Sequence, residues 1–176
     1  MKRFSPLWQM VGFIFTGILG TLLHFLFDLT GGNVVAALFS AVNESIWEHM
    51  KLLYYPMVLF ALVEFRFWGK EMPSFWNVKL RGILLGLILI PVLYYTYTGI
   101  LGKNADWFNI AIFFIAAGAA FWWETKLFQK AATPFLPSWA AVGILVLIAM
   151  LFSVLTFLPP RIPFFADPLT GTYGMR

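Results

Sequence analysis

The chain has 176 residues, of which 61% are hydrophobic and 11% are charged, and its formal net charge is +4. A mean hydropathy of +0.82 excludes a water-soluble globule for most of the chain. It predicts a single integral membrane domain over residues 1–176 instead. Without cysteine, the sequence also excludes disulfides, thiolate nucleophiles and cysteine metal sites.

Five apolar runs are long enough to cross a bilayer, because a spanning helix needs about 20 mostly apolar residues. They cover residues 7–27, 46–67, 80–101, 108–128 and 139–158. The first run is longer than a typical signal-peptide core, so we expect it to be retained as a span. Residues 33–41 are too short to cross and predict a re-entrant or interfacial helix. The predicted fold class is therefore all-α, a polytopic transmembrane bundle of about five spans plus one short helix.

The basic residues alternate between the two sides of these spans. One side gathers eight of them and the other side four: Lys2, Arg3, Arg66, Lys70, Lys79, Arg81, Lys126 and Lys130 against Lys51, Lys103, Arg161 and Arg176. Because cytoplasmic loops carry an excess of lysine and arginine, we expect a cytoplasmic N-terminus and an outward-facing C-terminus. The expected partner of these charges is the lipid bilayer, not nucleic acid.

Two further carboxylates, Glu64 and Glu124, lie close to Arg66 and Lys126 at the predicted cytoplasmic span ends. We expect each of them to be solvated or paired there. The run of small residues at 116–120 permits close helix packing, either within the chain or in a homo-oligomer.

Most of the chemistry-bearing residues lie on the predicted outer side, around the segment NESIWEHMK at 43–51. Ionisable groups beside membrane spans are costly, which makes them a functional hypothesis by default. His24 and Asp28 are four residues apart and share a helix face, and Glu44 and Glu48 repeat that spacing. Asp167 lies in the tail that emerges on the same side.

Imidazole and carboxylate donors from three segments suit a divalent metal ion such as zinc, iron or manganese. The candidate metal ligands are His24, Asp28, Glu44, Glu48 and Asp167. The candidate catalytic residues are Glu44, Glu48, His49 and Lys51, of which Lys51 would stabilise negative charge. On a regular helix His49 points about 100° from Glu48 and about 140° from Glu44, so these three side chains would not easily bind one ion.

Three functions are open at this point. The first is a membrane-embedded enzyme, metal-dependent or acid–base, that acts on a lipid or another hydrophobic substrate. The second is an ion- or proton-coupled transporter or solute-binding protein that uses the same carboxylates. The third is a structural or accessory protein in which Glu44 and Glu48 form a buried ion pair with Lys51. In that case Glu48 could also close a capping box with Ser45, and Asp28 could orient His24 by a hydrogen bond.

The segment NESIWEHMKLLYYP, preceded by LHFLFDLTGGN and followed far downstream by FFADPLTGTYG, resembles an uncharacterised family of small bacterial integral membrane proteins. The resemblance implies a bacterial inner-membrane location. It implies no established activity, so the chemistry has to be argued from the residues themselves.

Overall fold

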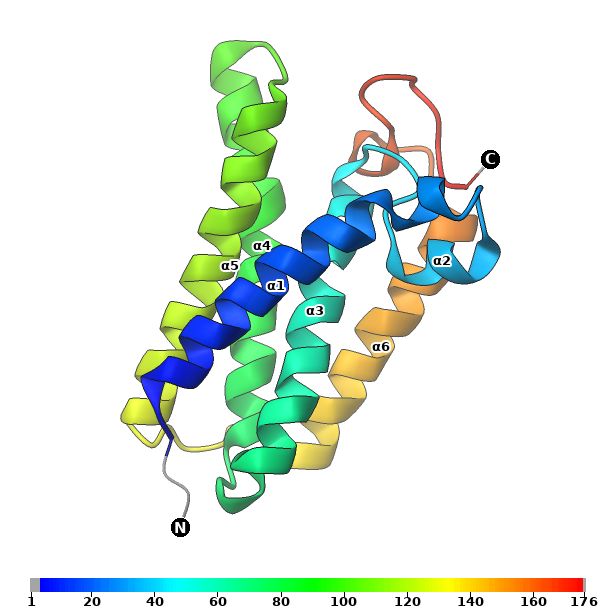
Figure 1. Cartoon of the computed structure of the whole chain (residues 1–176). Helices are drawn as coiled ribbons and strands as arrows, with labels where there is room; N and C mark the ends of the chain where they lie inside the picture. Colours follow the sequence, from blue (N-terminus) through cyan, green and yellow to red (C-terminus); the bar gives the residue numbers. More distant parts are fainter. Residues whose placement is uncertain (1–3, 176) are drawn as a thin grey trace.

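The computed structural model describes residues 4–175, which form six α-helices and two short 3-10 turns (Figure 1). A single isolated β-bridge joins Ala166 to Tyr173 in the tail. The elements are α1 (Pro6–Leu29), α2 (Val34–Phe39), α3 (Ile46–Phe67), η1 (Gly69–Glu71), α4 (Phe75–Leu101), α5 (Asp106–Gln129), α6 (Ser138–Phe157) and η2 (Pro163–Phe165).

Four of these helices, α1, α4, α5 and α6, are long and apolar enough to cross a membrane. The all-α prediction is confirmed, and the four candidate spans support a multi-pass membrane protein. Helix α3 has 22 residues and the predicted bounds, but it includes Glu48, Lys51, Glu64 and Arg66. Helix α2 has only six residues and lies within the predicted short segment 33–41.

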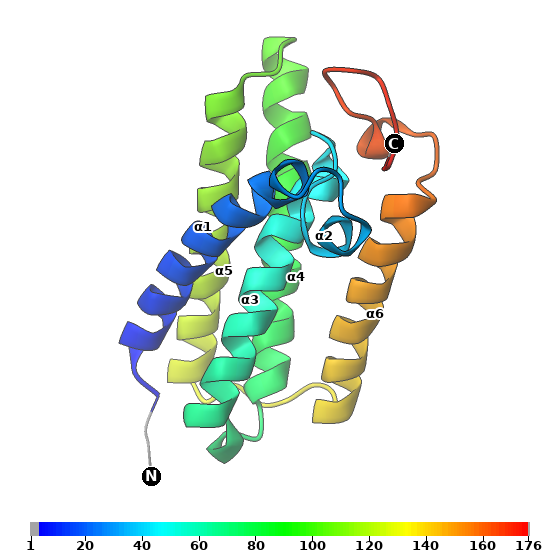
Figure 2. The same cartoon turned by 45° about the vertical axis from the view of Figure 1, so that its right-hand side comes forward.

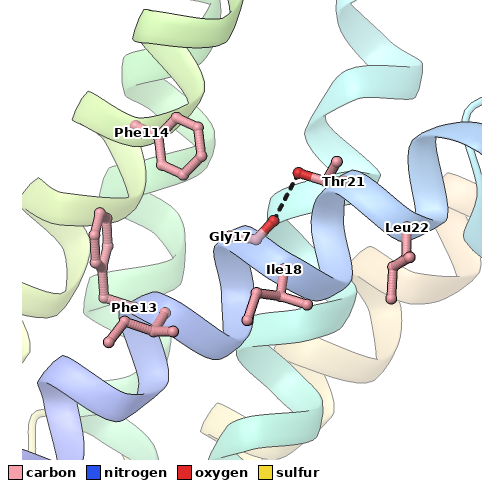
Figure 3. Close-up of a pocket in the computed structure, with 7 residues that line it drawn as sticks. Phe13, Gly17, Ile18, Thr21, Leu22 and Phe114 are labelled. Atoms are coloured by element: carbon pink, nitrogen blue, oxygen red, sulfur yellow. Dashed lines mark hydrogen bonds between the residues drawn. The ribbon is translucent and has the colours of Figure 1, made fainter.

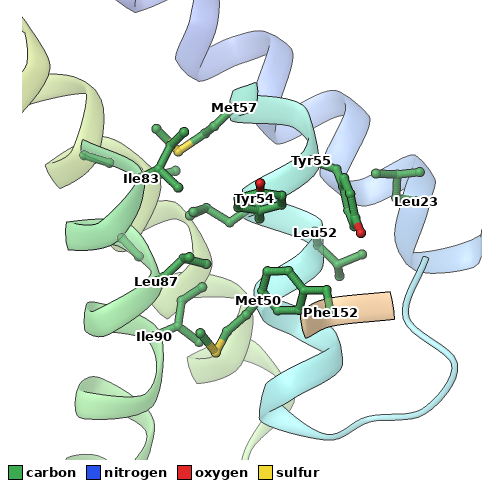
Figure 4. Packing of buried hydrophobic residues seen from close by; sticks show 14 of the residues in the cluster. Leu23, Met50, Leu52, Tyr54, Tyr55, Met57, Ile83, Leu87, Ile90 and Phe152 are labelled. Carbon is green, nitrogen blue, oxygen red and sulfur yellow. The ribbon is translucent and has the colours of Figure 1, made fainter. Parts of the chain in front are cut away.

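Helix α3 lies in the middle of the bundle, between α1, α4 and α6 (Figures 1 and 2). Its middle turns bury Tyr54 and Met57, which face Ile83 and Leu87 of α4 (Figure 4). Helix α1 crosses α3 closely at Gly20, where a Cβ would lie 2.6 Å from the backbone oxygen of Leu52. Only a glycine permits that approach without displacing a helix backbone.

The small-residue run of α5 packs inside the chain. Ala116, Ala117 and Ala120 are fully buried and belong to the main hydrophobic core. The run therefore provides close packing within one chain.

The two ends of the described chain lie at opposite ends of the bundle (Figure 1). The C-terminal tail covers the same end as α2 and the loop before α3. The Asn43 side chain donates to the Gly174 carbonyl at 3.2 Å, and Trp47 packs against Phe164 and Phe165. The loop that contains Glu44 is therefore held between α1 and the tail.

Candidate metal centre

His24, Glu44 and His49 come together at the end of the bundle that holds the C-terminal tail. One ligand atom from each residue lies within 4.8 Å of the other two, a grouping that could hold a metal ion. Glu44 Oε2 is 3.3 Å from His49 Nε2, and Glu44 Oε1 is 3.9 Å from His24 Nε2. The side chains are 30%, 42% and 29% exposed, in chain order, so the group is open to solvent on one side.

Glu44 reaches both histidines because it precedes helix α3. The helix begins at Ile46 and its N-cap is Ser45, whose Oγ accepts from the backbone N–H of Glu48 at 3.3 Å. The prediction that Glu44 and Glu48 share one helix face, and that His49 points away from Glu44, assumed a continuous helix. It is wrong for this reason. The predicted capping box is also only half formed, since the Ser45 N–H donates to Asn43 Oδ1 at 2.9 Å and not to Glu48.

Asn43 holds this loop from two sides. Its Oδ1 accepts from the Ser45 N–H, and its Nδ2 donates to the Gly174 carbonyl in the tail. The backbone of Glu44 is thus fixed by its immediate neighbour, and the carboxylate is directed toward the histidines.

The orientation of His49 is fixed by the backbone of its own helix. Its Nδ1 lies 2.9 Å from the Ser45 carbonyl oxygen, which can only accept a hydrogen bond. Nδ1 therefore carries the proton, and Nε2, which faces Glu44, carries a lone pair in neutral His49. A metal-ligating histidine commonly uses its second nitrogen in this way, because the bond fixes both tautomer and ring orientation.

His24 is the second imidazole of the group. Its ring centroid is 5.3 Å from that of His49 and 4.9 Å from that of Phe25. Its buried Nδ1 has no hydrogen-bond partner among the described residues. His24 thus offers Nε2 to the group, and no carboxylate or carbonyl of the described chain orients its other nitrogen.

The Glu44 carboxyl is ionised under ordinary conditions. Its interaction with His49 lowers its pKa, partial burial opposes this shift, and the charges of His49 and His24 lower the pKa further. A carboxylate between two imidazoles provides a mixed oxygen and nitrogen ligand set, which suits zinc, iron or manganese.

Three of the five predicted ligands, Asp28, Glu48 and Asp167, lie outside this three-residue group. Asp28 is exposed at the end of α1. Asp167 is buried, and its carboxylate accepts from the N–H groups of Leu169 and Thr170 and from the Thr170 hydroxyl. These bonds shape the tail turn and occupy both carboxylate oxygens.

Glu48 and Lys51 form a separate buried network with Thr156 of α6. Lys51 Nζ lies 2.6 Å from Glu48 Oε2, and it donates to the Ala37 carbonyl and the Thr156 hydroxyl at 2.8 and 2.9 Å. Glu48 also accepts from the Val42 N–H, and its Oε1 lies 2.9 Å from Thr156 Oγ1. The ammonium and both carboxylate oxygens are thus fully partnered, and the network ties α2, α3 and α6 together.

A third ionic group lies at the opposite end of the bundle. Lys79 of α4 contacts both Glu64 of α3 and Glu124 of α5, and Gln9 of α1 donates to Glu64 Oε1 at 2.6 Å. All four side chains are at most 3% exposed. The prediction that these glutamates are solvated or paired is confirmed in its second part, but their partner is Lys79 and not Arg66 or Lys126. Gln9, a polar residue inside the first apolar run, is the sequence signal that could have indicated a polar interior.

A family model described as "Family of unknown function (DUF6512)" matches residues 2–175. No curated protein and no solved structure is significantly similar to the chain. The match agrees with the resemblance carried by the three sequence motifs, and it adds no activity.

Proposed function

The chain belongs to DUF6512, a family of unknown function, and we propose that it is a membrane protein whose His24, Glu44 and His49 bind a divalent metal ion. The metal would serve chemistry on a lipid or another hydrophobic substrate. Zinc fits the ligand set best, and iron and manganese are the other candidates.

One observation carries this proposal, the approach of His49 Nε2 to Glu44 Oε2 at 3.3 Å. Because Nδ1 already donates to the Ser45 carbonyl, a neutral His49 directs a lone pair at the carboxylate, which is repulsive. A positive charge between the two atoms, either a proton or a metal ion, makes the arrangement favourable. The second imidazole, His24, favours the metal ion, since it supplies a third ligand that a simple hydrogen bond does not need.

Two histidines and a glutamate are a ligand set of catalytic zinc sites, in which the remaining position is left for water or substrate. A bound divalent ion would act as a Lewis acid and lower the pKa of that water. The partial exposure of all three side chains keeps such a position accessible.

A hydrophobic substrate is supported by an apolar groove between α1 and α5 (Figure 3). The groove has a volume of about 500 Å³ and is lined by Phe13, Ile14, Gly17, Ile18, Thr21, Leu22 and Phe114. At about 100° per residue, Gly17, Thr21 and His24 lie within about 60° on one side of α1. An acyl chain in the groove would therefore direct its polar end toward His24.

The proposed topology has five spans in one domain over residues 1–176. Helix α3 crosses the membrane in addition to α1, α4, α5 and α6, and α2 is a re-entrant or interfacial helix. The charges at Glu48, Lys51 and Glu64 do not oppose this role, because all three are buried against other helices. An odd number of spans agrees with chain ends at opposite ends of the bundle.

A cytoplasmic N-terminus remains the proposed orientation, in a bacterial inner membrane. Lys51 and Lys79 are buried and leave the charge comparison, and Lys2, Arg3 and Arg176 lie outside the described residues. The remaining basic residues still favour the N-terminal side as cytoplasmic: Arg66, Lys70, Arg81, Lys126 and Lys130 against Lys103 and Arg161.

Elemental analysis of purified protein tests the metal site. After loading with zinc and removal of unbound ion, wild type should retain about one equivalent. The double variant His24→Ala, Glu44→Ala should retain almost none. Glu71→Ala, which removes an exposed carboxylate at the opposite end, is the matched control and should behave as wild type. Equal, near-zero zinc in wild type and the double variant would refute the metal site.

A further inference from the structure

The ionic group formed by Gln9, Glu64, Lys79 and Glu124 carries an inference that does not depend on the metal site. Its members come from α1, α3, α4 and α5, and they meet where α1 and α4 begin and α3 and α5 end (Figure 1). This is the end of the bundle opposite His24, Glu44 and His49. In the proposed topology it is the cytoplasmic half of the membrane.

The charges of this group do not balance if both carboxyl groups are ionised. Lys79 Nζ contacts Glu64 Oε2 and lies 2.5 Å from Glu124 Oε2. Within the described residues, no other lysine, arginine or histidine nitrogen lies within 4.0 Å of either carboxylate. One negative charge is thus left without a partner among side chains that are at most 3% exposed.

The surroundings of the group offer little to stabilise that extra charge. The rings of Phe75, Phe121 and Phe128 surround the Lys79 ammonium at 5.8, 5.6 and 5.7 Å. Aromatic faces stabilise a cation but not an anion. A buried charge without a partner is strongly unfavourable, and a carboxylate in that position takes up a proton instead.

The hydrogen bonding of the group also favours a protonated carboxyl group. Gln9 and Glu124 each have a buried oxygen, Oε1, with no hydrogen-bond partner among the described residues. Both side chains are more than nine-tenths buried, and the Gln9 amide is already bonded to Glu64. The group therefore contains buried acceptor oxygens without a donor, and it also lacks one positive charge.

We propose that Glu64 and Glu124 form a binding site for one exchangeable proton, which the two carboxyl groups share beside Lys79. Uptake converts one carboxylate into a carboxylic acid, and the proton comes from water at the adjacent end of the bundle. The protonated group is neutral, with one carboxylate paired to the Lys79 ammonium. The chain thus holds a proton inside the membrane, about one helical turn from that end.

If Glu64 and Glu124 share one proton, substitution of either glutamate should have the same effect. In Glu64→Gln the remaining Glu124 becomes the carboxylate that pairs with Lys79, and in Glu124→Gln the remaining Glu64 does so. Either single substitution therefore removes the protonated carboxyl group, although each removes only one of the two side chains.

Infrared spectroscopy of the full-length protein in lipid nanodiscs at neutral pH tests this. Wild type should show a carboxylic acid carbonyl band that shifts in D2O. The band should vanish in Glu64→Gln and also in Glu124→Gln, and persist in the control Glu71→Gln. If one variant does not fold, the wild-type spectrum and the other variant complete the test. No such band in wild type, a band that survives in either variant, or its loss in the control would overturn the proposal.

Discussion

His49 directs Nε2 at the Glu44 carboxylate from 3.3 Å, while its Nδ1 is engaged by the Ser45 carbonyl at 2.9 Å. Glu44 and His49 are only five residues apart, yet their contact requires helix α3 to begin between them. A helix start at Ile46 leaves Glu44 on a loop that can turn back over the first helical turn. The same local break therefore creates both the carboxylate position and the orientation of the imidazole.

Removing His49 should abolish tight metal binding. We expect His49→Ala to weaken zinc binding by more than about 100-fold, because even outer-shell changes at metal sites cost about 10–100-fold. Competition titration with a zinc-binding dye in detergent measures the affinity. Asp28→Asn, which alters an exposed carboxylate at the end of α1, should bind zinc as wild type does. An equal loss in both variants would show that charge near the site matters and that the ligand set does not.

Asn43 should act through the position of Glu44. Asn43→Ala removes the bonds to Ser45 and Gly174, so we expect zinc affinity to fall about tenfold, as for other orienting partners of ligands. Asn109→Ala is the matched control, since Asn109 bonds to Tyr97 and Asn104 in the α4–α5 hairpin. The control should lower thermal stability with no effect on zinc. Unchanged zinc affinity in Asn43→Ala would argue against the positioning role.

The network of Glu48 and Lys51 should determine stability and not metal content. Lys51→Met leaves Glu48 as an uncompensated buried charge, which typically costs about 3–5 kcal/mol. The double variant Glu48→Gln, Lys51→Met removes both charges and should be more stable than Lys51→Met alone. Thermal unfolding in detergent measures this, and the folded fraction of each variant should still bind zinc. Normal stability together with lost zinc would instead give these residues the catalytic or ligand role that their sequence position suggested.

Glu44 should make the stability of the metal-free protein depend on pH. Its folded-state pKa lies below the ordinary value of 4.5, chiefly through His49. The ionised carboxylate therefore stabilises the fold while His49 is protonated, most strongly between pH 4.5 and about 6.5, the ordinary pKa of histidine. This contribution is lost as the pH falls through the folded-state pKa of Glu44. Melting temperatures of wild type and Glu44→Gln should differ at about pH 6 and converge in stronger acid. A difference that still grows below the ordinary pKa of a glutamate would contradict this assignment.

Much of the architecture follows from hydropathy and local signals. Ser45 caps α3 and Trp68 ends it, so the predicted bounds of residues 46–67 agree with the helix. The pairing of Glu48 with Lys51 also follows from their spacing, because residues three apart share a helix face. The loop position of Glu44 was not evident, since Glu44 has the same four-residue spacing from Glu48 that a helix would give.

The ionic group of Gln9, Glu64, Lys79 and Glu124 could not be predicted from the sequence for a different reason. Hydropathy begins the third long apolar run at residue 80, but Phe75 and Trp76 already belong to α4. Lys79 is therefore inside the helix and points into the bundle. Its partners Glu64 and Glu124 come from α3 and α5, and which helix faces meet is decided by packing across the whole bundle.

The central position of α3 has a consequence for how the chain enters the membrane. An isolated α3 would expose Glu48, Lys51 and Glu64 to lipid, and a charged residue in a span opposes insertion, by about 2.5–3.5 kcal/mol at the centre and by less toward the ends. Lys79 on the next helix neutralises Glu64, and Thr156 on the last long helix completes the network of Lys51. We therefore expect α3 to leave the translocon only after α4 has been synthesised, and the network of Glu48, Lys51 and Thr156 to form only after α6 has been synthesised.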